Sequence, residues 1–284
     1  MEQELGGVID VSSLASNLEL AEVGIWFSRT KSELSYPEEG NSLCYEIEEH
    51  SYWFQHRNRC IVEAVRHFPP PGPVFDVGGG NGFVSLALKQ AGFSPVLVEP
   101  GVEGARNARK RGLEPVICAT LEDAGFAKNS LPAVGLFDVL EHVKDDEGFL
   151  RTVRDLSKAP DGRLYVTVPA YQSLWSNEDR LAGHYRRYSA ARLVGLLERL
   201  GFTTAFFTHI FAPLPLPIFL IRTIPSRLGI RRSLDFAQAR GELSAPPSPL
   251  SRALSAALKV ELRALRRGTR IPFGGSCLVV ATVR

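Results

Sequence analysis

The sequence lacks the features that mark disulfide-stabilised, zinc-binding and strongly basic proteins. Its cysteines are few and scattered, with no Cys-x-x-Cys pair and no histidine at ligand spacing: Cys44, Cys60, Cys118 and Cys277. This spacing excludes a disulfide framework and a zinc motif, and it favours free thiols in a reducing compartment. The formal net charge is only +2, which is too small to indicate nucleic acid as the main partner.

Long apolar runs are also missing. Residues 1–4 are acidic and lead into no apolar stretch, so no signal peptide is expected. The most apolar run, residues 210–221, has 12 residues and is interrupted by three prolines. A helix that spans a bilayer needs about 20 apolar residues. With 44% hydrophobic and 23% charged residues the composition is that of a globular protein, and we expect it to be cytoplasmic.

From residue 69 onward the sequence alternates between strand-like and helix-like segments. A helix over residues 45–68 is stopped by the proline-rich residues 69–73. Five short apolar strands follow, with helices between them: strands at 74–77, 95–99, 115–118, 133–139 and 164–168, and helices at 83–90, 102–111, 147–157 and 190–200. This alternation predicts a parallel sheet covered on both faces. Two further strand-like runs lie at 203–208 and 276–283.

The segment between those last two runs has a different composition. From Arg222 to Arg270 there are 11 Lys or Arg against 3 Asp or Glu, an excess of 8 positive charges. A helix over 251–267 places its leucines close to one face and its basic residues largely elsewhere: Leu254, Leu258, Leu262 and Leu265, and Arg252, Lys259, Arg263, Arg266 and Arg267. The helix either packs on the rest of the protein with its charges in solvent, or makes peripheral contact with an anionic membrane or lipid-linked substrate.

These segments predict three parts of the chain. Residues 1–68 form an N-terminal segment and helix that cover the site. Residues 69–211 and 273–284 form the α/β domain, and residues 212–272 form a basic, proline-rich helical cap.

A glycine-rich loop between the first strand and its helix is the strongest candidate site. Residues 76–82 read Asp-Val-Gly-Gly-Gly-Asn-Gly. Open α/β sheets bind nucleotides at this position, because glycine lets the backbone approach a ligand and the following helix offers unpaired N–H groups. Glu99 ends the second strand, where a carboxylate can accept hydrogen bonds from both hydroxyls of a ribose. The sequence therefore predicts a nucleoside-containing cofactor.

The spacing within the loop distinguishes between two kinds of cofactor. Nicotinamide dehydrogenases use Gly-x-Gly-x-x-Gly, because a pyrophosphate must rest on the helix end. Here the spacing is Gly78-x-Gly80-x-Gly82, and Asp76 precedes it. A carboxylate at that position would repel pyrophosphate, but it suits a cofactor that carries an ammonium and a sulfonium group. S-adenosylmethionine (SAM) has both groups.

Together with Glu99-Pro100 and residues 137–143, this loop resembles the successive motifs of class I SAM-dependent methyltransferases. Within that superfamily the chain resembles a bacterial branch related to the ubiquinone-biosynthesis type. The likeness covers residues 45–284 and includes residues 52–57, 183–189 and 272–276. It implies a doubly wound, seven-stranded, mostly parallel sheet, the Rossmann-like methyltransferase fold. It also implies an antiparallel last strand, an N-terminal helical segment and a helical insertion before that strand.

The resemblance and the residue pattern together give a cofactor site. Its expected members are Arg57, Asp76, Gly78, Gly79, Gly80, Gly82, Glu99, Pro100, Leu121, Glu122, Phe137, Asp138 and His142. The family often carries an acid–alanine pair after the third strand to meet the adenine amino group, and here Leu121 or Glu122 takes that place. Arg57 either pairs with the methionine carboxylate of SAM or lies on a solvated helix face. His142 either approaches the site or closes its turn.

His184 and Tyr188 are the candidate catalytic residues. His184 follows the fifth strand, so its loop should open near the sulfonium, where imidazole can take a proton at neutral pH. Arg186, Arg187 and Tyr188 would grip the acceptor; alternatively, His184 and Tyr188 only pin the loop to the next helix. Nothing in the sequence requires a metal.

We therefore expect methyl transfer from SAM to a small-molecule, sugar or lipid-linked acceptor, as O-methylation, with no nucleic-acid partner. The alternatives are a nicotinamide-dependent oxidoreductase and a SAM-binding regulatory protein that lacks catalysis.

Overall fold

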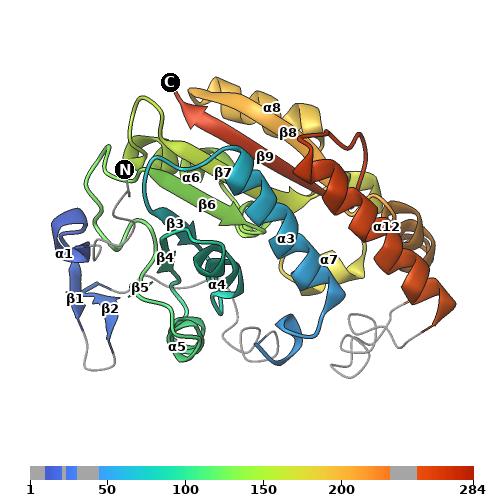
Figure 1. Ribbon diagram of the computed structural model, residues 1–284, viewed down its shortest axis with the longest axis horizontal. Coiled ribbons are helices and arrows are strands. Elements are labelled where there is room, and N and C mark those ends of the chain that lie inside the picture. The colour runs from blue at the N-terminus through green and yellow to red at the C-terminus, as the bar shows by residue number, and fades with distance from the viewer. Residues whose placement is uncertain (1–9, 21–23, 31–44, 231–247) are drawn as a thin grey trace.

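A single large sheet organises the chain (Figure 1). This computed structural model describes residues 10–20, 24–30, 45–230 and 248–284, so Cys44 and the acidic residues 1–4 lie outside the described residues. The strands are β1 (Leu18–Leu20), β2 (Ile25–Ser28), β3 (Val74–Val77), β4 (Pro95–Val98), β5 (Val116–Cys118), β6 (Ala133–Phe137), β7 (Arg163–Pro169), β8 (Phe202–Ile210) and β9 (Ser276–Val283).

Helices follow most strands, as the alternating pattern predicts. They are α1 (Val11–Leu14), α3 (Tyr52–His67), α4 (Phe83–Gln90), α5 (Val102–Lys110), η1 (Leu140–His142), α6 (Asp146–Leu156), η2 (Gln172–Leu174), α7 (Asn177–Leu181), α8 (Ala190–Arg199), α9 (Pro215–Ile218), η3 (Phe219–Thr223), α10 (Ile224–Arg227) and α12 (Pro249–Arg266). The described helices include none that is long and apolar enough to cross a bilayer.

The strand order is β1-β2-β5-β4-β3-β6-β7-β9-β8. The five central strands, β5, β4, β3, β6 and β7, run parallel to one another. β9 lies between β7 and β8 and is antiparallel to both. The predicted mostly parallel, doubly wound α/β fold is therefore confirmed, including its antiparallel last strand.

The predicted count of seven strands is wrong, because the described residues form nine. β2 pairs in parallel with β5, and β1 pairs antiparallel with β2. The two strands have only three and four residues, too few to show a period-2 pattern in the sequence. Ile25 in β2 is nonetheless fully buried at this sheet edge. β1 and β2 thus extend the sheet beyond β5.

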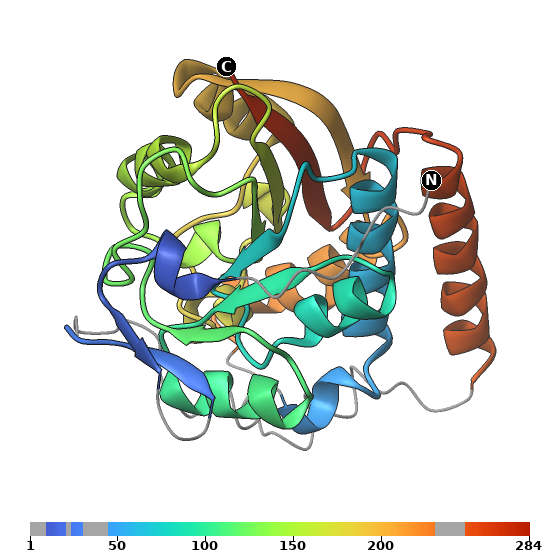
Figure 2. The ribbon, with the colours of Figure 1, turned by 60° about the vertical axis from the view of Figure 1, so that its left-hand side comes forward.

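Helices cover both faces of the sheet because side chains alternate along each strand. Val74 packs in one core cluster with α3, α4 and α12, whereas its neighbour Phe75 packs in another with α6 and α8. α12 runs alongside α3 at one side of the molecule (Figure 2). The sheet therefore has a separate core on each face, with α1 packed into one and α12 into the other.

The position of a ligand site follows from the strand order. β3 has β4 on one side and β6 on the other, so the chain connections run in opposite directions from it. Ligands of open α/β sheets bind at such a switch point, outside the carboxyl ends of the strands. The glycine loop after β3 and the residues after β6 and β7 lie at this edge.

Candidate active site

The glycine loop between β3 and α4 has a backbone that other residues rarely adopt. Gly78, Gly80 and Gly82 have positive φ angles of 69°, 54° and 75°. A Cβ atom on Gly79 would lie 2.8 Å from Asp76 Cγ, so a side chain there would displace the carboxylate. α4 begins directly after the loop and directs its first N–H groups toward it. Glycine at residue 79 therefore lets the loop pack directly against Asp76 and Leu97.

Asp76 is fully buried near the end of β3. Its Oδ2 accepts a hydrogen bond from the Ser85 hydroxyl at 2.7 Å, while the buried Oδ1 has no hydrogen-bond partner among the described residues. Burial raises the pKa of Asp76 to about 6, although the Ser85 bond and the charge of Arg57 oppose this. A buried carboxylate oxygen without a donor costs free energy. A cationic ligand group beside it would recover that cost.

Glu99, directly after β4, holds the glycine loop through its carboxylate. Oε2 accepts a hydrogen bond from the Gly80 N–H and Oε1 from the Gly101 N–H, each at 2.8 Å. Burial raises the pKa of Glu99 to about 7 in spite of these two bonds. Each oxygen keeps a second lone pair, so the fixed carboxylate can accept further bonds from two adjacent hydroxyls. The structure thus brings Glu99 and the loop together.

Arg57 joins α3 to the end of β6. Its Nη1 donates to Asp138 Oδ2 at 2.6 Å, and the Thr167 hydroxyl donates to Asp138 Oδ1 at 3.0 Å. The guanidinium also lies 5.0 Å from the centre of the Trp53 ring and 5.2 Å from that of Phe54. Arg57 is buried, so the alternative of a solvated helix face is wrong. Its charge lies close enough to lower the pKa of Asp76.

Four other residues of the expected cofactor site differ in their burial. Leu121 and Phe137 are buried in the two main core clusters, so their side chains serve packing. An adenine contact from the Leu121 side chain is therefore not supported. Pro100 is half-buried after Glu99, and Glu122 is exposed in the turn that follows β5.

His184 lies on the loop between α7 and α8 and pairs with a carboxylate that sequence reasoning missed. Its Nδ1 is 3.0 Å from Asp179 Oδ1, and Arg187 Nε donates to the same oxygen at 2.8 Å. Burial raises the pKa of Asp179, but the hydrogen bonds and charge of these two partners outweigh it and lower the pKa to about 2. Asp179 is therefore ionised at neutral pH. The Ser176-x-x-Asp179 capping box of α7 was its only signal in the sequence.

His142 contacts His184 across the space between the loops after β6 and β7. The two rings meet edge to face with centroids 4.7 Å apart. Burial and the nearby His184 lower the pKa of His142 to about 4, so its ring is neutral at neutral pH. The Tyr185 N–H donates to the Glu141 carbonyl at 2.8 Å, which ties the two loops together.

Tyr188 and Glu141 are buried beneath these loops. The Tyr188 ring has no exposure, and its hydroxyl donates to Asp146 Oδ2 at 2.8 Å, with burial and Asp146 raising its pKa. Glu141, which sequence reasoning gave no role, is also buried, and the pKa of its carboxyl is raised well above the usual value by burial and by Asp138. Neither side chain reaches the surface.

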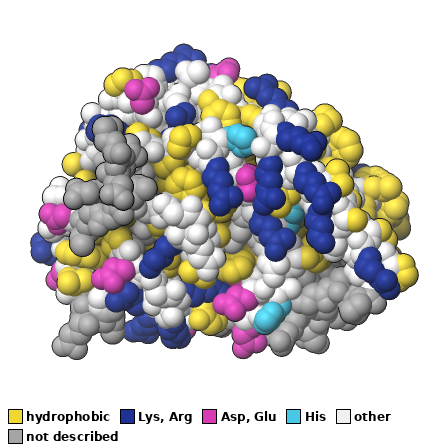
Figure 3. All heavy atoms as spheres, in the orientation of Figure 1, with side chains coloured by type: hydrophobic (Ala, Val, Ile, Leu, Met, Phe, Trp, Pro, Cys, Tyr) yellow, Lys and Arg dark blue, Asp and Glu magenta, His cyan; other side chains and the backbone are white. Residues whose placement is uncertain are grey.

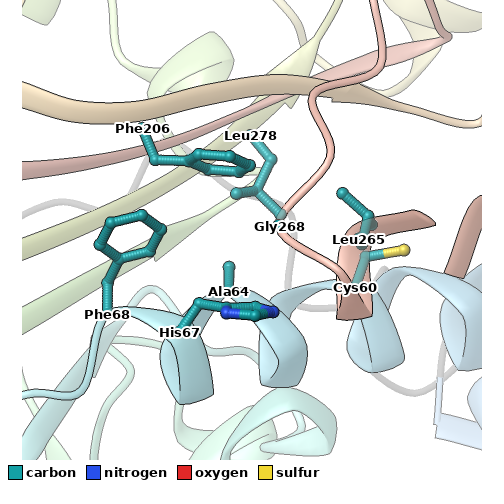
Figure 4. A pocket seen from close by; sticks show the side chains of 8 residues that line it. All are labelled: Cys60, Ala64, His67, Phe68, Phe206, Leu265, Gly268 and Leu278. Atoms are coloured by element: carbon teal, nitrogen blue, oxygen red, sulfur yellow. The ribbon is translucent and has the colours of Figure 1, made fainter. Parts of the chain in front are cut away.

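A cavity of about 100 Å³ lies elsewhere, between α3, α12 and strands β8 and β9 (Figure 4). Its lining is largely apolar, with Phe68, Phe206 and Leu278 on one side and Cys60 and His67 from α3 on another. None of the glycine-loop residues lines it. The cofactor candidates therefore form a separate site at the carboxyl edge of the sheet.

The chain is similar to one protein family model and to several solved structures. Residues 47–205 match the family model described as "Methyltransferase domain". No curated protein matches the sequence. Among solved structures, a Thermotoga maritima SAM-dependent methyltransferase, described as a possible histamine N-methyltransferase, aligns with TM-score 0.52 and 18% identity. The alignment covers 86% of this chain and 99% of that one.

Two further solved structures share the fold. Phosphoethanolamine N-methyltransferase 2 of Haemonchus contortus, solved with SAM, aligns with TM-score 0.52 and 15% identity over 88% of this chain and 58% of that one. The [4+2]-cyclase SpnF aligns with TM-score 0.53 and 16% identity over 89% and 99%. At these identities the structures are evidence for the fold alone.

Proposed function

The chain belongs to the methyltransferase domain family, and with SAM as its cofactor we propose that it methylates an oxygen of a small-molecule, sugar or lipid-linked acceptor. The Asp179–His184 pair is the observation that supports an oxygen acceptor, because an O–H group must lose a proton during transfer. The family match favours this enzyme over a nicotinamide-dependent oxidoreductase.

The proposed cofactor site lies along the glycine loop. Glu99 would accept hydrogen bonds from the two ribose hydroxyls, while Asp76, whose Oδ1 has no described partner, would pair with the ammonium group. Arg57, held by Asp138, would attract the methionine carboxylate. Glu122 is the remaining polar candidate for the adenine. Bound SAM supplies a methyl group on a positively charged sulfur.

The proposed transfer is an in-line displacement that needs a base on the acceptor side. SAM, held by Glu99, Asp76 and Arg57, would supply its methyl group to the acceptor oxygen, and the electrons of the carbon–sulfur bond would remain on sulfur. His184 Nε2 takes the proton of the acceptor hydroxyl. Asp179, ionised and bonded to Nδ1, fixes the ring and stabilises the imidazolium that forms. The His184 ring is therefore already oriented to act as the base.

His142 and Tyr188 act differently in this proposal. His142 stays neutral and keeps the His184 ring in place through their edge-to-face contact. Tyr188 serves the loop rather than the acceptor, because its ring is buried and its hydroxyl is bonded to Asp146. We assign Tyr188 to positioning, in place of the catalytic role that its sequence position suggested.

The cap segment, residues 212–272, is proposed to cover the acceptor side. Thr223 donates to the Leu174 carbonyl at 3.0 Å, and Arg227 donates to the Ser173 carbonyl at 2.9 Å. These bonds attach the cap to the loop after β7, which continues to His184. Residues 52–57 and 183–189 further support placing the chain near the ubiquinone-biosynthesis type.

The test is SAM turnover on a panel of phenols, sugars and prenyl-linked alcohols, with amines as the contrasting class. Substituting His184→Gln should lower turnover on the responding hydroxyl by about 10²–10⁴-fold and leave SAM affinity nearly unchanged. His67→Gln, an exposed histidine on α3, is the matched control. Methylation of amines only, or full turnover in His184→Gln, would refute oxygen transfer by this base. The SpnF likeness makes turnover, rather than SAM binding, the deciding measurement.

A further inference from the structure

The segment from α9 to Ile230 exposes several large apolar side chains. Five of its large apolar side chains are each more than half exposed: Leu216, Leu220, Ile221, Leu228 and Ile230. Contiguous exposed apolar patches on soluble proteins usually mark contact with a partner or a membrane. The segment is nonetheless fixed in place, because Thr223 and Arg227 hydrogen-bond the backbone of η2.

α12 presents a row of positive charges to solvent. Arg252, Lys259, Arg263 and Arg267 are spaced by seven, four and four residues, so they share one face of the helix, and all are exposed. The opposite face is buried against α3 through residues such as Leu258. The packing alternative of the sequence analysis thus accounts for the leucines, while the basic face is left in solvent.

The buried side of α12 is bonded to the backbone just before the apolar segment. Glu261, on the buried side of α12, accepts hydrogen bonds from the N–H groups of Phe211 and Ala212 at 2.7 Å and 2.6 Å, just before α9. Figure 3 shows Lys and Arg side chains gathered over this side of the molecule, with hydrophobic side chains at its right-hand edge. The apolar segment is therefore anchored to the helix that carries the basic face.

We propose that these residues form a docking surface for an anionic lipid membrane. The docking surface comprises Leu216, Leu220, Ile221, Leu228 and Ile230 of the apolar segment and Arg252, Lys259, Arg263 and Arg267 of α12. Apolar side chains enter the headgroup region while cations attract anionic lipids, which is the usual division of work in peripheral membrane binding.

Positive charge together with exposed apolar side chains favours a membrane over two other partners, a nucleic acid and a second copy of the chain. A nucleic acid would use the cations but leave the apolar side chains in water. A second copy of the chain would bring two basic faces together, which like-charge repulsion opposes. The 11 basic against 3 acidic residues from Arg222 to Arg270 fit an anionic surface. Membrane docking can be tested apart from SAM binding, because no docking-surface residue belongs to the proposed cofactor site.

Vesicle co-sedimentation tests the docking surface. The full chain should bind vesicles that contain phosphatidylglycerol, bind pure phosphatidylcholine vesicles weakly, and dissociate as salt is raised. Changing Lys259→Glu, Arg263→Glu and Arg267→Glu together should weaken binding by at least about 100-fold. Arg266 is left intact because it pairs with Glu63 at 3.0 Å.

Two further variants separate the parts of the surface. Leu220→Ser, Ile221→Ser and Leu228→Ser together should leave only weak, salt-sensitive binding. The matched control, Arg106→Glu, Lys158→Glu and Arg199→Glu, makes the same charge change at exposed residues outside the surface and should bind as the wild type does. Absence of wild-type binding, or equal loss in the control, would overturn the proposal. SAM affinity, measured in each variant without vesicles, reports on the cofactor site separately.

Discussion

Asp76 and Glu99 are two buried acids of the proposed cofactor site, and burial disfavours their charged forms. Their pKa values are raised to about 6 and about 7. Because the folded pKa lies above the unfolded one, each acid stabilises the fold fully below its unfolded pKa. That contribution is lost as pH rises through the folded pKa. Without a ligand, the contribution of these two groups to the free energy of unfolding therefore falls as pH rises from about 4 to about 7.

The affinity for SAM should rise with pH, whereas the stability of the unliganded protein should fall. Its ammonium and ribose hydroxyls need ionised carboxylates, so protons must leave Asp76 and Glu99 when SAM binds at low pH. We expect SAM affinity to rise by at least about 10-fold between about pH 5.5 and about pH 7.5, then level off. Calorimetry in buffers of different ionisation enthalpy would measure both the affinity and the proton release.

Glu99→Gln is the control for that pH dependence. The amide keeps the shape of the side chain but cannot titrate, so the rise in affinity should become shallower and its midpoint should fall toward that of Asp76. Affinity itself should fall by about 1.5–3 kcal/mol at neutral pH, the range for hydrogen bonds to charged groups. An affinity that does not change with pH in the wild type would remove both acids from the cofactor site.

The sequence predicts the position of residues at the ends of strands. It does not predict the contacts or burial of loop residues, which depend on the folded chain. Asp76 lies near the end of the buried strand β3 and Glu99 directly follows β4, so the sheet edge alone predicts their position. Asp179 reaches His184 because the chain folds back after α7, where the His184 N–H donates to the Asp179 carbonyl. The pattern of residues in the sequence did not indicate this contact. Tyr188 looked like an acceptor contact because a loop residue's burial depends on distant strands and helices, not on its neighbours in sequence.

At the scale of elements, the β3–loop–α4 unit depends on a backbone that only glycine adopts readily. Gly80→Val should abolish the stabilisation of the protein by SAM, because φ at this residue is 54° and its N–H bonds Glu99. Gly92→Val is the matched control, since Gly92 also has positive φ but nothing within 4 Å of a Cβ atom. Thermal melts with and without SAM measure the effect. A Gly80→Val protein that SAM stabilises as it does the wild type would place the loop away from the cofactor.

Most elements of the α/β domain could be predicted because their sequences carry a repeating signal. α4 begins and ends at the predicted residues 83 and 90, and α12 differs from its prediction by one or two residues. β1 and β2 could not be predicted, because strands this short are held by pairing with each other and, through β2, with β5, rather than by an amphipathic pattern. Pairing between distant segments is a property of the whole fold.

At the scale of the whole molecule, α3 connects the cofactor site to the cap. Arg57 pairs with Asp138 at the sheet edge, and the preceding residue, His56, pairs with Glu261 of α12 at 2.7 Å in a buried position. Removing one partner of a buried pair is strongly destabilising because it leaves a polar group without its partner. The cofactor site and α12 are therefore linked through consecutive residues of one helix.

This link predicts that SAM stabilises α12 together with α3. A ligand at about 100 times its Kd adds about 2.7 kcal/mol to the free energy of unfolding, which slows exchange of globally protected amides by about 100-fold. Hydrogen exchange should therefore slow in the buried turns of both helices when SAM is added. In Glu261→Gln the link to His56 is weakened, so the effect on α12 should shrink while that on α3 remains. If SAM slows exchange in α3 but leaves α12 unchanged in the wild type, α12 docks independently, and the His56–Glu261 pair does not carry the coupling.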